Sequence, residues 1–246
     1  MNRDISVEGR DFSVSSFDEI PSLIAAAHEL KSPLSLIRQL SLELNTDKNI
    51  SASKRKLIDQ IQLTSELGLR LTTNLTKASR LEDSIFELDP VNPRVLCQQV
   101  ADDLRPLYHA KGRDIEVSAP KRPLLALANR DLLYRIILNF GDNALHYAQN
   151  NEIVQLKISS LNRGKKIRIG VRDFGPYVAS DVWQRLRREL GKTSQSIHAR
   201  PASSGLGLYI ASKFANSMNG SIGAIRHRDG ATFYVTVDSS LQLSLI

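Results

Sequence analysis

Two long helical patterns follow each other near the start of the chain, and they constrain its fold more than any other feature. Apolar residues recur at spacings of three and four over residues 17–45, and again over residues 54–86. A short polar segment, Thr46–Ser53, separates the two patterns. Two long helices joined by a short loop predict an antiparallel helical hairpin, which we assign to residues 17–88.

A hairpin of this kind encloses no core of its own, so its apolar faces need a partner. The economical solution is a homodimer in which two hairpins close a four-helix bundle. The alternative is a hairpin that packs against the rest of its own chain. The preceding residues, 1–16, are polar and are predicted to form a loose arm.

The segment Asp89-Pro90-Val91-Asn92-Pro93 breaks the helical pattern and predicts a domain boundary. Beyond it, residues 89–246 mix helical and strand periods and predict an α+β sandwich, with a mixed sheet covered on one face by helices. The basic, irregular stretch between Val178 and Ser204 is interpreted as a functional lid. The expected elements are helices at 93–110, 130–146 and 206–218, and strands at 114–118, 123–128, 153–160, 166–173, 221–227 and 231–237.

Composition excludes several classes of protein. The net charge of +7 comes from small scattered groups of basic residues that are not interleaved with aromatic residues, which argues against direct nucleic-acid binding. The single cysteine, Cys97, rules out an internal disulfide, and burial is the favoured explanation for it. No apolar stretch approaches the roughly 20 residues of a membrane span. We expect a cytoplasmic chain, attached to a membrane only if a segment upstream of Met1 provides the anchor.

The first helix carries the sequence His28-Glu29-Leu30-Lys31-Ser32-Pro33-Leu34. Pro33 removes one backbone hydrogen bond and clashes with the carbonyl of Glu29, so the helix should bend beside His28. His28 and Ser32 share a helix face. A neutral imidazole is a nucleophile, and an adjacent carboxylate can fix its tautomer or take its proton. Taken alone, a His-Glu pair on a helix is more often a solvated surface pair.

Two further motifs carry oxygen ligands. Asn139 and Asn143 are four residues apart in a predicted helix and present two amide oxygens on one face, which suits magnesium shared with phosphates. Asp173 ends a predicted strand and starts Asp173-Phe174-Gly175-Pro176-Tyr177; its carboxylate can accept an N–H from a purine. The alternatives are capping amides and a plain turn at the strand end.

A third motif, Gly205-Leu206-Gly207-Leu208, opens a predicted helix. Glycines at a helix N-terminus let backbone N–H groups approach phosphates, and the helix dipole adds attraction. Such glycines are common, so this motif is weak evidence when it is taken alone.

In their order and spacing these motifs resemble those of bacterial sensor histidine kinases, whose catalytic domain is of the GHKL ATPase (Bergerat) type. The resemblance covers residues 17–238. It implies that His28 carries the phosphoryl group, that Glu29 assists the transfer, and that Ser32 helps to dephosphorylate the partner. It also implies a nucleotide site made of Asn139, Asn143, Tyr147, Asp173, Gly175, Tyr177, Gly205, Leu206, Gly207 and Leu208, with Asn143 as magnesium ligand supported by Asn139.

The function implied by this resemblance is a two-component kinase core that uses Mg-ATP, works as a homodimer and passes the phosphoryl group to an aspartate of a response-regulator receiver domain. The chain departs from the family pattern at Ala27, His146, Tyr177 and Ser203. Tyr177 replaces the second glycine of its motif, where glycine would permit a close backbone approach. Two alternatives therefore stay open: a non-catalytic dimeric scaffold, and a protein that acts mainly as a response-regulator phosphatase.

Overall fold

The computed structural model describes residues 19–46, 50–79, 87–147, 152–176, 179–181, 183–184, 190 and 206–240. The chain divides into two compact units, Met1–Ser79 and Arg80–Ile246. The predicted arm over residues 1–16 lies outside the described residues. Among the described helices, none combines the length and the apolar character that crossing a membrane requires.

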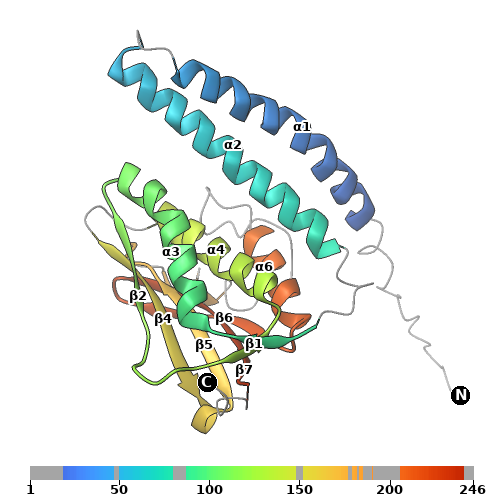
Figure 1. Cartoon of the computed structure of the whole chain (residues 1–246), viewed down its shortest axis with the longest axis vertical. Helices are drawn as coiled ribbons and strands as arrows, with labels where there is room; N and C mark the ends of the chain where they lie inside the picture. Colours follow the sequence, from blue (N-terminus) through green and yellow to red (C-terminus); the bar gives the residue numbers. More distant parts are fainter. Residues whose placement is uncertain are drawn as a thin grey trace, which may run out of the picture. The chain divides into compact units, whose positions relative to one another are not determined.

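The first unit is a hairpin of α1 (Glu19–Asn45) and α2 (Ala52–Ser79), which lie side by side in Figure 1. Both predicted helices are confirmed over the described residues, and α1 continues through Pro33. A Cβ atom on Gly68 would come within 2.9 Å of Leu34 Cδ1, so the two helices approach closely there. Small and polar residues fill much of the seam between the two helices, where Ala27, Ser41, Ser65 and Thr72 are buried.

Beside the face that packs on α2, α1 carries a stripe of apolar residues that the hairpin leaves exposed. Leu30, Ile37, Leu40 and Leu44 follow the helical repeat, and their residues are 53%, 42%, 49% and 55% exposed. This stripe lies beside the seam with α2 rather than in it. The hairpin therefore leaves a continuous apolar surface along α1.

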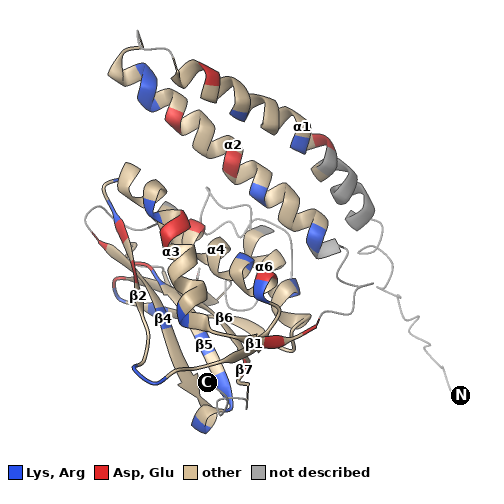
Figure 2. Cartoon of the chain, in the orientation of Figure 1, with Lys and Arg blue, Asp and Glu red and all other residues tan. Residues whose placement is uncertain are grey.

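α2 carries charged residues of both signs, with acidic residues in its middle and basic residues towards both ends, as Figure 2 shows. Glu66 lies 3.8 Å from Arg38 Nε of α1 and 3.7 Å from a guanidinium nitrogen of Arg70, one turn further along α2. These pairs are partly exposed, and exposed pairs of this kind contribute about 0–1 kcal/mol each. The packing of the two helices therefore depends mainly on the seam.

The second unit is built on a five-stranded sheet with the order β2-β4-β5-β7-β6. β2 pairs with β4 in parallel and every other pair is antiparallel, so the predicted mixed sheet is confirmed. The strands are β2 (Asp114–Ser118), β4 (Ile153–Leu161), β5 (Lys166–Arg172), β6 (Ser221–His227) and β7 (Gly230–Asp238).

Three helices cover one face of this sheet, as predicted: α3 (Pro93–Ala110), α4 (Arg130–Tyr147) and α6 (Leu206–Asn216) (Figure 1). Alternate residues of β5 point into this interface, and Ile167, Ile169 and Val171 are all buried. Cys97 of α3 is fully buried in the same core, as expected, and burial raises the pKa of its thiol to about 12.

The expected break at residues 89–93 contains a short strand that the sequence analysis did not predict. β1 (Asp89–Val91) pairs antiparallel with β3 (Ala126–Ala128), and this strand is shorter than the one expected over 123–128. Pro90 is tolerated because a two-stranded ribbon leaves an edge where no N–H is needed. Asn92 then caps α3, and its side chain accepts hydrogen bonds from the backbone N–H groups of Arg94 and Val95.

Candidate functional site

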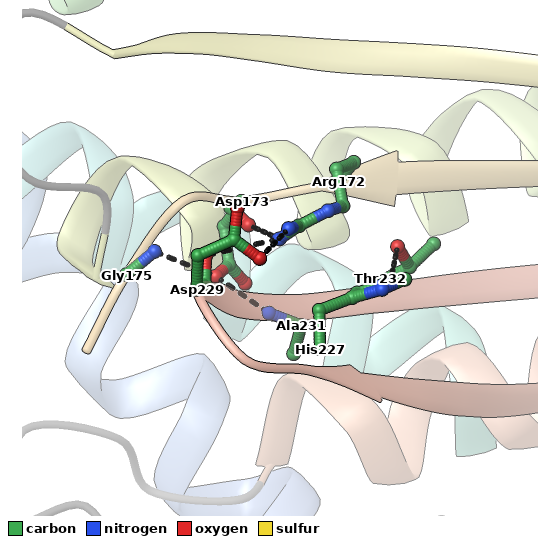
Figure 3. Close-up of polar contacts among 7 residues, drawn as sticks. All are labelled: Arg172, Asp173, Gly175, His227, Asp229, Ala231 and Thr232. Carbon is green, nitrogen blue, oxygen red and sulfur yellow. Dashed lines mark hydrogen bonds and ion pairs between the residues drawn. The ribbon is translucent and has the colours of Figure 1, made fainter. Parts of the chain in front are cut away.

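Asp173 lies at the end of β5 and is 1% exposed. Its Oδ1 atom accepts two backbone hydrogen bonds, one from Gly175 N at 3.2 Å and one from Ala231 N at 3.0 Å (Figure 3). Gly175 follows Asp173 in the chain, whereas Ala231 belongs to β7. The carboxylate is thus held in place by one N–H from its own segment and one from a strand that is distant in the sequence. A buried carboxylate fixed in this way can accept a hydrogen bond from a ligand N–H.

Gly230 makes this arrangement possible. Its φ of +125° is strained for any residue with a side chain. A Cβ atom at this position would lie 2.4 Å from the backbone oxygen of Asp173 and 2.7 Å from its Oδ1 atom. Only glycine lets the turn before β7 come so close to the end of β5, and so present the N–H of Ala231 to the carboxylate.

Asn139 and Asn143 lie four residues apart on α4, which packs against α6. Asn139 is 6% exposed, and its amide nitrogen donates to the carbonyl oxygen of Gly207 at 3.5 Å. Asn143 is half-buried. The asparagine helix therefore meets the first turn of the glycine-rich helix, as a site shared by a cation and phosphates would require.

Tyr108 of α3 is hydrogen-bonded to the middle of α4. Its hydroxyl donates to the carbonyl oxygen of Gly141 at 2.8 Å, in the turn between the two asparagines. A Cβ on Gly141 would lie 2.4 Å from Leu104 Cδ1, so glycine also lets α3 approach closely. Burial raises the pKa of the Tyr108 phenol well above its ordinary value, and the nearby carboxylates of Asp142 and Asp173 raise it further. The phenol therefore stays protonated and donates a hydrogen bond to the carbonyl oxygen of Gly141.

Two residues that hold the site were not predicted from the sequence: this tyrosine, and Arg172, whose side chain contacts Asp229 beside Asp173. Neither residue belongs to a recognisable motif. A buried aromatic at a helical core position and a single arginine at a strand end give no signal in the sequence by themselves.

The remaining predicted site residues are placed as follows. Glu29 and Ser32 are exposed on α1, and His28 lies in the same helix. Gly207 and Leu208 lie in the first turn of α6. Tyr177, Gly205 and most of the predicted lid lie outside the described residues, as do the side chains of His28, Tyr147 and Leu206.

The chain is similar to known families and proteins over both of its units. A family described as "Histidine kinase-, DNA gyrase B-, and HSP90-like ATPase" matches residues 128–241. Hybrid signal transduction histidine kinase K of Dictyostelium discoideum is 24% identical over 92% of this chain and 20% of that protein. Sensor histidine kinase YcbM of Bacillus subtilis is 27% identical over 80% of this chain and 63% of that protein.

Among solved structures, full-length ShkA in complex with AMPPNP is 27% identical, with a TM-score of 0.62. The similarity covers 92% of this chain and 47% of that one. The chain therefore spans only part of the length of these relatives, from about a fifth to somewhat under two thirds.

Proposed function

Because the chain belongs to the sensor histidine kinases, with a catalytic domain of the GHKL type, we propose that it phosphorylates its own His28 from Mg-ATP. The phosphoryl group would then pass to an aspartate of a response-regulator receiver domain. In this proposal residues 17–88 carry the phosphoacceptor and the dimer contacts, and residues 89–246 bind the nucleotide. Since ATP is the phosphoryl donor, the reaction would take place in the cytoplasm.

The observation that carries the proposal is the contact between Asn139 of α4 and Gly207 of α6. Two motifs separated by a long stretch of sequence meet there, one with amide oxygens and the other with N-terminal backbone N–H groups. Amide oxygens suit a hard cation, and helix N-termini attract phosphates. Their meeting supports a site for the phosphate end of a nucleotide.

The other end of the nucleotide is assigned to Asp173. Its carboxylate is buried and is held by backbone N–H groups from two segments of the chain. A carboxylate in this setting accepts a hydrogen bond from the amino group of adenine. It disfavours a purine with a carbonyl oxygen in place of that amino group, because two oxygens would then face each other without a proton between them. Asp173 thus gives the site its preference for the base.

The residues present also fit magnesium. Asn139 and Asn143 would hold the ion, since both offer amide oxygens on one face of α4 where this helix meets the glycine-rich turn. When bound, the ion would neutralise charge on the phosphate oxygens. The amide nitrogen of Asn139 donates to the carbonyl oxygen of Gly207 at 3.5 Å, and in this orientation its amide oxygen is the atom that would bind the ion.

At the phosphoacceptor, a ring nitrogen of His28 would attack the γ-phosphorus in line with the bond to the leaving ADP oxygen. A P–N bond forms, the P–O bond breaks, and the other ring nitrogen loses its proton to Glu29 or to water. Glu29 follows His28 on α1 and its side chain is exposed. Positioning and charge neutralisation account for most of the catalysis in phosphoryl transfer.

The first test is incubation of the purified chain with γ-labelled ATP and magnesium, beside the variant His28→Ala. We expect acid-labile label on the wild-type protein and none on the variant, while both bind ATP equally. Retained label in His28→Ala would refute the assignment of the phosphoacceptor. ATP binding without any label on the wild type would refute autophosphorylation, and absence of ATP binding would favour the scaffold alternative.

The phosphatase alternative is separated by Ser32→Ala, because Ser32 lies one helical turn beyond His28 and is exposed. If the chain acts mainly as a phosphatase, this variant keeps autophosphorylation and loses dephosphorylation of a phosphorylated receiver domain. An unchanged rate of receiver dephosphorylation would rule out that role for Ser32.

A further inference from the structure

Arg172 is an unusually buried charged residue beside the proposed nucleotide site. It is the last residue of β5 and is 6% exposed, although it alternates with the side chains that face the helices and so lies on the opposite face of the sheet. Its register partner on β7 is Thr232. A guanidinium buried to this extent requires partners for its charge and its N–H groups, and those partners show what it holds.

The partners of Arg172 come from two separate segments (Figure 3). One terminal nitrogen donates to the Asp229 carboxylate at 2.5 Å, and the other reaches the Asp229 backbone oxygen at 3.3 Å. The second nitrogen also donates to the backbone oxygen of Asp173. The guanidinium carbon lies 4.3 Å from the centre of the Phe174 ring, over its face. The side chain therefore connects the segment after β5 with the turn between β6 and β7.

These are the two segments that hold the carboxylate of Asp173. Gly175 supplies one N–H from the first segment, and Ala231 supplies the other, two residues after Asp229. Two hydrogen bonds join these segments at Asp173: Ala231 N donates to Oδ1 at 3.0 Å, and Asp173 N donates to the Ala231 carbonyl oxygen at 2.9 Å. A shift of the β6–β7 turn relative to the segment after β5 would therefore change the position of the carboxylate. Resting on the nucleotide-binding function proposed above, we propose that Arg172 is the positioning residue that fixes Asp173 for recognition of the adenine amino group, with Asp229 as its anchor.

A comparison of ATP with inosine triphosphate tests this role directly. Inosine carries a carbonyl oxygen where adenine carries its amino group, so only ATP can donate a hydrogen bond to Asp173 at this place. The ratio of the two dissociation constants measures how well the carboxylate is positioned. Partial unfolding of a variant leaves this ratio unchanged because both nucleotides bind the same folded fraction, so a purely structural role would not alter it.

For Arg172→Met we expect ATP to bind roughly tenfold more weakly, while inosine triphosphate binds with nearly unchanged affinity. The second variant, Asp229→Asn, keeps the turn but removes the charge that anchors the guanidinium, and should show a smaller loss in the same direction. The Asp229 side chain is 65% exposed, so this variant is expected to fold even if Arg172→Met does not.

Arg168→Met provides the matched control. Arg168 lies four residues earlier on the same strand and the same sheet face, and its guanidinium carbon lies 4.0 Å from the centre of the Tyr234 ring. This variant removes an arginine and its ring contact from the sheet without altering the segments around Asp173. It should keep the wild-type ratio of affinities.

An unchanged ratio in Arg172→Met and Asp229→Asn would overturn the positioning role, while wild-type preference for ATP would leave the proposed function intact. An equal loss of ratio in Arg168→Met would also overturn it, since the effect would then belong to the sheet as a whole. A wild-type chain that binds both nucleotides equally would overturn the assignment of Asp173 and, with it, this inference.

Discussion

At the scale of single residues, Gly230 shows how one backbone position supports the site. Its positive φ and its approach to the backbone of Asp173 are separate demands, and each excludes a side chain. Gly164 shares the first demand, with a φ of +93°, but nothing lies within 4 Å of the place where its Cβ would be. The pair therefore separates the cost of backbone strain from the cost of the close contact.

We predict that Gly164→Ala loses about 1 kcal/mol of unfolding free energy through strain alone. Gly230→Ala should lose more, about 2–4 kcal/mol, because the turn must also move away from Asp173. Urea unfolding of both variants measures this difference. ATP affinity should fall only in Gly230→Ala, since its displaced turn carries the N–H of Ala231. Equal effects of the two substitutions would show that contact with Asp173 contributes nothing.

At the scale of elements, the β6–β7 hairpin contributes both to the site, through Ala231, and to the stability of the second unit, through His227. His227 ends β6 opposite Gly230, and its Nε2 atom lies 2.9 Å from Thr232 Oγ1. Partial burial lowers the pKa of His227 below its ordinary value, and the positive charge of Arg172 lowers it further. Lys157 acts in the same direction, whereas the carboxylates of Asp229 and Asp173 oppose the shift.

This shift makes the stability of the second unit depend on pH. Because the folded state binds the proton of His227 more weakly than the unfolded state, the stabilisation is complete above the ordinary histidine pKa of about 6.5. It is lost as the pH falls from there through the lower pKa of the folded state. The midpoints of urea unfolding can be compared at pH 7.5 and pH 5.5, which bracket the ordinary histidine pKa of about 6.5. The two midpoints should differ less in His227→Gln than in the wild type.

His109→Gln is the comparison variant for this measurement. The His109 side chain is 59% exposed at the end of α3, outside the β6–β7 hairpin, and its Nε2 atom lies 3.5 Å from Asp114. The pH dependence of stability should change more in His227→Gln than in His109→Gln. If His227→Gln shows the same loss of stability on acidification as the wild type, then the titration of other groups explains the pH dependence.

At the scale of the whole molecule, the exposed stripe Leu30, Ile37, Leu40 and Leu44 supports the proposed homodimer. Within one chain these side chains remain substantially in contact with water. Burial of apolar surface contributes about 25 cal/mol for each Å² removed from water, so a second hairpin packed on this stripe would be stabilised by it. The stripe lies beside the seam between α1 and α2, as a four-helix bundle requires.

We predict that Ile37→Lys converts a dimer into a monomer, measured by sedimentation equilibrium. The helical content of the hairpin should persist, because Ile37 does not lie in the seam with α2. Leu42→Lys is the matched control: Leu42 is also exposed, at 38%, but lies on the opposite side of α1 from the stripe at roughly 100° per residue. A dimer that survives Ile37→Lys would place the interface elsewhere.

Much of this protein could be predicted from local patterns. The helices of the hairpin, the helices at Pro93–Ala110 and Arg130–Tyr147, and the strands of the mixed sheet follow the periodicity of their apolar residues, because a helix or strand buries one face at a fixed period. Asn139 and Asp173 could also be predicted to be site residues. Asn139 is one of two asparagines four residues apart on a predicted helix, and Asp173 is a carboxylate at the end of a predicted strand. The short strand β1 escaped prediction because its partner, β3, is distant in sequence.

Tertiary structure alone decided how the site is held together. The bond from Tyr108 to Gly141, the reach of Arg172 to Asp229 and the donation of Ala231 to Asp173 all join residues that no local period relates. The first depends on the packing of α3 on α4, and the other two depend on the neighbouring positions of β5 and β7. Gly141 and Gly230 let the segments approach at these places. The chain's own residues therefore determined which elements form and which ligands they carry, whereas packing determined which of those ligands face one another.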